Sequence, residues 1–170
     1  AGPGFGVVSS DPGGAGRRGL IVAAGEQLWL LEARDPTAMT FRRRRIEVPG
    51  LTGPIRGLLA LDVTRNGVED LVVAGPAGLR VLENTRSPDA AWLRLRLIGQ
   101  RMSNRDGIGC VVDVRHKETH QTMLLRGGGG YLSSGPTELL VSFRAPDDAG
   151  FLRVTWPSGS RQPLSSASLG

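Results

Sequence analysis

Two stretches decide the fold of this chain: residues 20–32 read LIVAAGEQLWLLE, and residues 71–83 read LVVAGPAGLRVLE. The second follows the first at a distance of 51 residues, and identical residues recur at that distance for Leu20, Val22, Ala23, Leu28, Leu31 and Glu32. Each stretch is an apolar run, a glycine-containing turn and a second apolar run, which is typical of a β-hairpin. We therefore expect the first half of the chain to contain two copies of one β unit.

The repeat extends into the loop before each hairpin. Residues 62–70 read DVTRNGVED, residues 11–19 read DPGGAGRRG, and Asp11 and Gly16 align with Asp62 and Gly67. These loops resemble the FG-GAP or VCBS repeats, the blades of integrin-like β-propellers, in which D-x-D-x-D-G-x-x-D precedes an apolar strand. In that family, four side chains and one backbone carbonyl bind Ca²⁺. Carried over to the second loop, this set is Asp62, Thr64, Asn66 and Asp70, with the carbonyl of Val68.

Both loops depart from the family pattern. The second loop has two carboxylates among four ligand positions, and the first keeps Asp11 alone. Calcium needs several anionic oxygens to replace its water shell. We expect Asp62 and Asn66 to make Asx-type hydrogen bonds that hold a tight turn, with calcium at the Asp62 loop as the alternative. No other cofactor is expected.

Four consecutive arginines occupy residues 42–45. Such a run suggests nucleic-acid binding. In an extended strand, however, alternate side chains point to opposite faces, and a charged run is typical of an exposed edge strand. We predict an edge strand and no nucleic-acid partner.

The second half begins with residues 91–99, AWLRLRLIG, and contains six short strand-like runs in about 75 residues. Such spacing predicts a small antiparallel sandwich or barrel. The half resembles the ASPIC/UnbV family through four stretches in order: WLRL at 92–95, SNRDGIG at 103–109, GGGYLSS at 128–134 and VTWPSG at 154–159. The expected fold is thus all-β, with two propeller-blade-like units in residues 1–88 and an ASPIC/UnbV-like β domain in residues 89–170.

These stretches also supply the candidate partner-binding residues. Arg105 and Asp106 lie in the SNRDGIG stretch, Tyr131 follows three glycines, and Trp156 adjoins a Pro-Ser-Gly turn. Among the three tryptophans, we expect Trp156 to be the most exposed.

Composition narrows the functional classes. The 170 residues carry a net charge of +5, Lys117 is the only lysine, and the basic excess lies mostly in the second half. Arginine forms bidentate contacts with anionic groups, so attachment to an anionic surface is a third-ranked function. The single cysteine, Cys110, falls in an apolar run and is expected to be a buried thiol. No run approaches the roughly 18 apolar residues that span a bilayer.

We find no catalytic constellation in the sequence and expect a non-enzymatic protein. Two propeller repeats cannot close a propeller of 4 to 8 blades. We therefore expect either a fragment of a longer protein or a short relative whose open edges another protein covers. The preferred function is a protein-interaction or accessory/assembly subunit of a larger extracytoplasmic complex, with other protein subunits as partners. The alternative is a secreted adhesion or carbohydrate-binding module with a weak calcium loop. The family resemblance implies a periplasmic or secreted location, peripheral to a membrane complex. The sequence identifies neither the partner nor the parent assembly.

Overall fold

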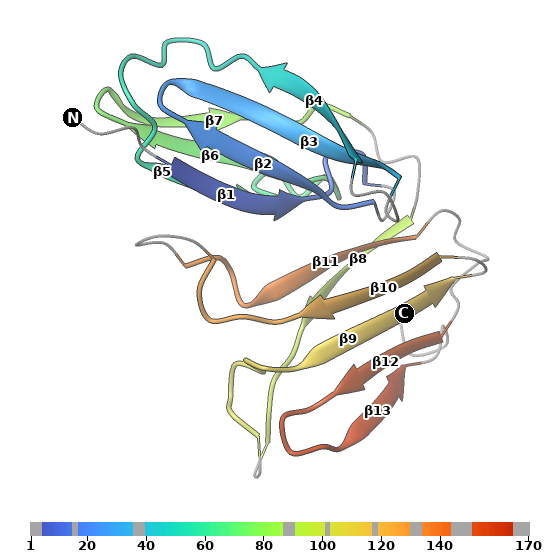
Figure 1. The fold of residues 1–170 in the computed structure, drawn as a ribbon. Helices are drawn as coiled ribbons and strands as arrows, with labels where there is room; N and C mark the ends of the chain where they lie inside the picture. Colours follow the sequence, from blue (N-terminus) through green and yellow to red (C-terminus); the bar gives the residue numbers. More distant parts are fainter. Residues whose placement is uncertain are drawn as a thin grey trace. The chain divides into compact units, whose positions relative to one another are not determined.

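The computed structural model describes residues 5–14, 17–35, 40–86, 91–100, 103–116, 119–129, 134–143 and 151–164. These residues contain thirteen β-strands and no helix, which confirms the all-β prediction (Figure 1). In this part of the chain, no helix is long and apolar enough to cross a membrane. Two compact units are present. Unit 1 comprises Ala1–Gly13, Arg17–Ser87 and Gly128–Gly135, and unit 2 comprises Gly14–Gly16, Pro88–Gly127 and Pro136–Gly170.

Unit 1 is built from two antiparallel sheets. The first has the order β1-β2-β3-β4, with β1 at Phe5–Ser10, β2 at Gly19–Ala24, β3 at Gln27–Asp35 and β4 at Thr40–Ile46. The second has the order β5-β6-β7, with β5 at Gly57–Leu61, β6 at Asp70–Gly75 and β7 at Gly78–Leu82. In both sheets, consecutive strands are neighbours, as short hairpin turns require.

The strand registers confirm the repeat of 51 residues. Val22 lies opposite Trp29, and Val73 opposite Arg80. Each register pair of the second sheet lies 51 positions after a pair of the first sheet. The turn before the repeated hairpin matches as well, since Gly14 and Arg65 have φ angles of 60° and 59°. The two sheets are therefore copies of one β meander.

Each sheet has two faces, because successive side chains of a strand point to opposite sides. We call face A of the first sheet the side that carries Gly6, Val8, Ile21, Ala23, Leu28 and Leu30, and face B the side that carries Val7, Ser9, Leu20, Val22, Trp29 and Leu31. On the second sheet, face A is the side that carries the residues 51 positions after those of face A on the first sheet, and face B is defined in the same way.

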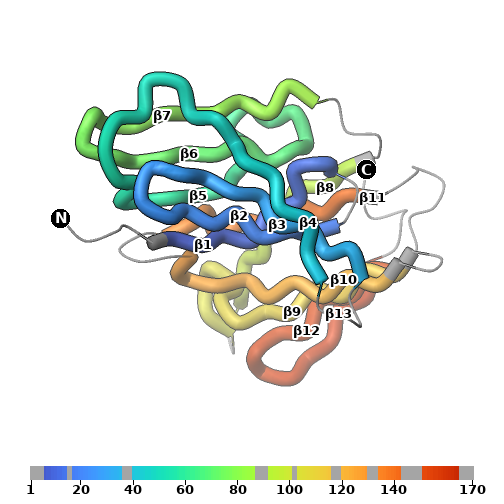
Figure 2. The backbone as a smooth tube through the Cα atoms, turned by 45° about the horizontal axis from the view of Figure 1, so that its top comes forward, coloured from blue at the N-terminus to red at the C-terminus, as the bar shows by residue number. Residues whose placement is uncertain are grey.

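The core of unit 1 joins face A of the first sheet to face B of the second. It contains Val8, Ile21, Ala23, Leu28 and Leu30 from the first sheet, and Leu58, Leu71 and Val73 from the second. A Cβ atom at Gly6 would lie 3.7 Å from the Cβ atom of Leu58. Strands β1 and β5, the first strands of the two sheets, run close together where the sheets meet (Figures 1 and 2).

The arginine run forms strand β4, which lies at the edge of the first sheet with its arginines exposed. The predicted edge strand is confirmed. The Arg43 guanidinium carbon lies 4.5 Å from the centroid of the Trp29 ring, and Arg45 pairs with Glu47 at 3.3 Å. Two of the four arginines in this run, Arg43 and Arg45, therefore have partners: an aromatic ring and a carboxylate, respectively.

Unit 2 has six strands among its described residues, as predicted. They are β8 at Ala91–Arg96, β9 at Val111–His116, β10 at Thr119–Leu124, β11 at Glu138–Phe143, β12 at Phe151–Thr155 and β13 at Arg161–Leu164. They form a four-stranded sheet, β10-β9-β12-β13, and a two-stranded sheet, β11-β8. The sheets remain open, so the sandwich form of the prediction is the correct one.

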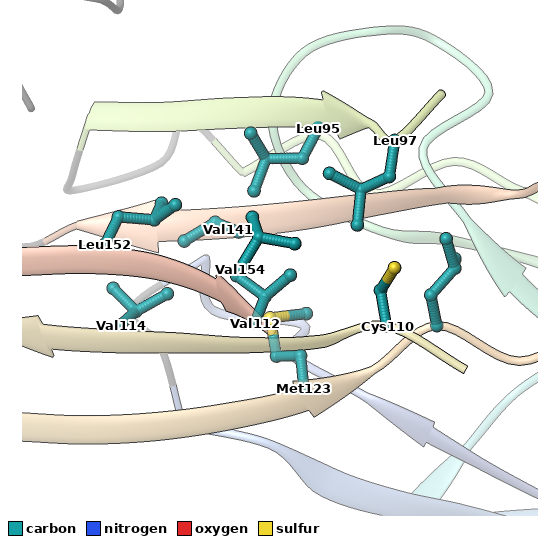
Figure 3. Close-up of a cluster of buried hydrophobic side chains, with 10 residues drawn as sticks. Leu95, Leu97, Cys110, Val112, Val114, Met123, Val141, Leu152 and Val154 are labelled. Carbon is teal, nitrogen blue, oxygen red and sulfur yellow. The ribbon is translucent and has the colours of Figure 1, made fainter. Parts of the chain in front are cut away.

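One apolar cluster fills the interior of unit 2 (Figure 3). Val112, Val114, Leu152 and Val154 come from the four-stranded sheet, and Val141 comes from β11. Cys110 belongs to this cluster and is fully buried, which confirms the predicted thiol. Burial raises the pKa of the Cys110 thiol, because the thiolate loses its hydration.

Candidate functional site

The Asp62 loop is held by its own hydrogen bonds. Asn66 N–H and Gly67 N–H donate to the two carboxylate oxygens of Asp62 at 3.0 and 3.1 Å, and Val68 N–H donates to Asn66 Oδ1 at 3.1 Å. Gly67 has φ of 88°, where a side chain would be strained. The predicted Asx-type turn is confirmed.

Asp70 closes the other side of this loop. The fully buried carboxylate accepts Val63 N–H and Thr64 N–H at its Oδ2 atom, at 2.8 and 3.1 Å, and Asn84 N–H at Oδ1, at 2.7 Å. The Thr64 hydroxyl donates to the same Oδ2 atom at 3.3 Å. A buried charge is tolerated when several donors solvate it in this way.

The loop is a poor fit for calcium in this geometry. Both carboxylates direct both of their oxygens to protein N–H groups, and the amide oxygen of Asn66 does the same. Val68, whose carbonyl would complete the set, is fully buried. The described part of the chain contains no group of three or more His, Cys, Asp or Glu side chains that could hold a metal. Calcium at this loop stays a prediction that a titration must test.

A polar network ties the first loop to the second. The backbone N–H of Asp11 donates to Glu69 Oε2, with 2.8 Å between nitrogen and oxygen, and Arg18 Nη2 forms an ion pair with Glu69 Oε1 at 2.9 Å. Arg18 also donates to the hydroxyl and carbonyl oxygens of Ser9, and Asn84 Nδ2 donates to the Pro12 carbonyl at 2.9 Å. No sequence motif marks Arg18, Glu69 or Asn84, because their partners lie up to 72 positions away.

In unit 2, the SNRDGIG stretch forms a tight turn around Asn104. Asn104 accepts Ile108 N–H at Oδ1, at 2.8 Å, and donates from Nδ2 to the Ile108 carbonyl at 2.6 Å. Gly107 has φ of 64°, and a Cβ atom there would lie 2.7 Å from the Cβ atom of Leu97. Asparagine and glycine in this motif are therefore explained by the geometry of the turn.

The same turn meets the TWPSG stretch. A Cβ atom at Gly109, whose φ is 89°, would lie 3.3 Å from Pro157 Cγ. Trp156 packs on the core of unit 2 and donates from Nε1 to Gln162 Oε1 at 3.2 Å. Two of the four ASPIC/UnbV-like stretches, distant in sequence, thus lie in contact.

The predicted partner-binding residues differ in where the structure places them and in how exposed they are. Arg105 and Asp106 lie at the exposed tip of the Asn104 turn, and Trp156 is half-buried. Tyr131 lies outside the described residues. The expectation that Trp156 is the most exposed tryptophan is wrong, because Trp92 exposes more of its surface, 38%.

The outer face of the four-stranded sheet in unit 2 is polar at its centre. Asp113 lies between Thr122 and Arg153 in the strand register, and it accepts the Thr122 hydroxyl and Arg153 Nη2, each at 3.0 Å. The hydrogen bond from Arg153 is the main reason that the pKa of Asp113 is lowered. Pairing of this kind, seen again between Arg94 and Glu138, neutralises part of the arginine excess of the second half.

Unit 1 exposes apolar side chains on the outer faces of both sheets. On face B of the first sheet, 54% of Val7 and 38% of Leu20 are exposed; on face A of the second, the figures are 65% for Leu79 and 54% for Val81. Apolar side chains exposed together on one sheet face are candidates for burial against a partner. These faces could not be recognised from sequence, because their residues have the pattern of ordinary core positions.

Comparison with known proteins identifies one region. The family model described as ASPIC and UnbV matches residues 100–169. This match covers most of unit 2, including the Asn104 turn and the TWPSG stretch. No curated protein and no solved structure gave a significant match.

Proposed function

We propose that the chain is a non-enzymatic protein-interaction or accessory subunit of a larger extracytoplasmic complex. The observation that carries this proposal is the exposed apolar surface on the two outer faces of unit 1, represented by Val7, Leu79 and Val81. Burying such surface against another protein is favourable by about 25 cal/mol for each Å² removed from water. Strands β4 and β7 lie at sheet edges, where a partner strand can add to the sheet.

We further propose that the sheets of unit 1 are two degenerate FG-GAP/VCBS-type repeats. The repeat of 51 residues in strand register and the Asx-type loop before β6 support this assignment. The same proposal includes a periplasmic or secreted location, which the resemblance to these families supports.

The test is the native mass of the protein isolated under gentle conditions from its source. We expect a complex of defined stoichiometry, heavier than the 18.0 kDa chain. The Val81→Arg variant of the chain, expressed in the same cells, should be absent from that complex, because a charged side chain then replaces the apolar contact. A chain that runs as a lone monodisperse monomer in its native source would contradict the proposal.

The alternative function, a secreted adhesion or carbohydrate-binding module, has weaker support. Exposed aromatic rings can stack on sugars, and Trp92 on β8 is exposed. A glycan array, probed with and without calcium, separates this function from the preferred one. Binding that Trp92→Ala removes would favour the alternative.

A further inference from the structure

The open face A of the second sheet reproduces the buried face A of the first sheet. Gly57, Ala74 and Leu79 are identical to their counterparts Gly6, Ala23 and Leu28. The other three pairs are conservative: Leu59 for Val8, Val72 for Ile21 and Val81 for Leu30. In the first sheet, five of these six positions belong to the buried core, whereas Leu79 and Val81 are exposed in the second. The part of face A around Leu79 and Val81 is thus left open, whereas Gly135 of the same unit lies against Leu59.

The open face B of the first sheet reproduces the covering surface. Leu20, Val22 and Leu31 are identical to Leu71, Val73 and Leu82, which belong to or pack against the core from face B of the second sheet. Val7 and Ser9 replace Leu58 and Ala60, and Trp29 replaces Arg80. The apolar residues of both halves of the internal interface thus recur on exposed faces, although Arg43 and Arg18 lie over Trp29 and Ser9 on face B and must move aside for a partner sheet.

We infer that two copies of this chain stack head to tail, with face A of β5–β7 in one copy packed on face B of β1–β4 in the next. This inference rests on the proposed interaction function and names its partner as a second copy of the chain. The contact is heterologous, since two different surfaces meet. Such contacts generate rings when the rotation between copies closes, and two to four copies would supply the 4 to 8 sheets of a closed propeller.

The internal interface also predicts one intermolecular contact. Gly6 on face A faces Leu58 on face B, with 3.7 Å between the built Cβ position and the Leu58 Cβ atom. Shifting each residue by the repeat places Gly57 of one copy against Val7 of the next. This separation falls within the range of about 3.5 to 4.5 Å between Cβ atoms that a disulfide requires.

Disulfide trapping tests this contact in the full chain carrying Cys110→Ala. One preparation has Val7→Cys and the other has Gly57→Cys. We expect a disulfide-linked dimer in the mixture and little in either preparation alone, because head-to-tail stacking does not bring identical positions together. Glu26→Cys, at an exposed turn between β2 and β3, is the matched control and should not cross-link with either preparation.

A second variant checks that the cross-link reports this interface. Adding Leu79→Arg to the Gly57→Cys chain should abolish the dimer, whereas Val63→Arg, in an exposed loop, should leave it unchanged. A Cβ atom at Gly57 would lie 3.2 Å from that of Ala74, so the folding of this variant must be verified. If it does not fold, Leu79→Arg in the natural sequence provides the test, because it should reduce the sedimenting mass to that of one chain.

Absence of a mixed dimer with folded proteins, or equal cross-linking by Glu26→Cys, would overturn the inference. So would a natural chain whose sedimenting mass Leu79→Arg leaves unchanged. A native complex that contains this chain once, with other proteins, would preserve the proposed function while rejecting self-stacking. A monomer in both settings would reject both.

Discussion

The two units of this protein bury sheets in different ways. In unit 2, the four-stranded sheet is apolar on its inner face and carries the hydrogen-bonded Asp113, Thr122 and Arg153 at the centre of its outer face. The exposed side chains of Leu124 and Phe151 lie on the same outer face, toward its two ends. In unit 1, each sheet is covered by the other on one face. The opposite faces expose apolar side chains such as Val7 and Leu79, and in the first sheet the exposed arginines of β4 lie beside them.

This difference indicates where apolar surface is left for a partner. The exposed apolar residues of unit 1 lie on the sheet faces opposite its core, at Val7 and Leu20 in the first sheet and at Leu79 and Val81 in the second. In unit 2, an ion pair between Asp113 and Arg153 occupies the centre of the outer face of the four-stranded sheet. The interaction function that we propose belongs mainly to unit 1, while the ASPIC/UnbV match belongs to unit 2.

The largest expected effect is a difference in the free energy of unfolding between substitutions at two equivalent repeat positions of unit 1, Leu28 and Leu79. Leu28→Ala, at a fully buried site, should lower the free energy of unfolding by about 2 to 5 kcal/mol. Leu79→Ala, 51 residues later and 65% exposed, should change it by less than about 0.5 kcal/mol in dilute solution. Urea unfolding at low protein concentration measures both. Equal losses would contradict the assignment of covered and open faces.

A second prediction concerns the loop network of unit 1. Asp70→Asn places an amide NH₂ against backbone N–H donors and should cost about 3 kcal/mol of stability. Hydrogen exchange read strand by strand should show faster exchange in β6, with β9 of unit 2 unaffected. Matched acceleration in β9 would show that the two units unfold together rather than separately.

The third prediction acts on the polar face of unit 2. Because the pKa of Asp113 is lower in the folded state, its stabilisation is complete above the unfolded pKa and is lost as the pH falls through the folded value. Asp113→Asn should cost about 1.5 kcal/mol at pH 7 and progressively less in acid. Thermal unfolding of both proteins from pH 7 to pH 2 checks the sign. A gap between natural protein and variant that widens in acid would be inconsistent with this pairing.

The smallest expected effect is that of calcium. A ligand that binds the native state raises the melting temperature, and we expect millimolar calcium to change it by less than about 1 °C relative to a chelator. The reason is that the oxygens of Asp62 and Asp70 already accept protein donors. A clear increase that Asp62→Asn abolishes would instead establish the calcium loop and favour the adhesion alternative.

Much of the fold was predictable because it is encoded locally. The recurrence of Leu20, Ala23 and Leu28 at 51 residues predicted the repeated hairpin, and the arginine run predicted an edge strand. Local turn chemistry likewise predicted the Asx-type bonds of Asp62. Each of these features depends on periodicity or on neighbours within a few residues.

The remaining features depend on long-range packing. Leu28 and Leu79 are the same residue in the same repeat position, so composition cannot tell that one is buried and the other open. Arg18, Glu69 and Asn84 show no motif, since they become a network only when the two loops meet. The greater exposure of Trp92 than of Trp156 also follows from tertiary packing, because Trp156 covers the core of unit 2.

The most direct test asks whether the open faces of unit 1 join copies of the chain. It is sedimentation equilibrium of the purified natural chain, the Val81→Arg variant and the loop control Val63→Arg. The open faces predict that the natural chain and Val63→Arg sediment at two or more times 18.0 kDa, and that Val81→Arg sediments as a single chain. A natural chain that remains at 18.0 kDa up to high concentration, with the same mass for both variants, would contradict the claim that these faces are interfaces between copies.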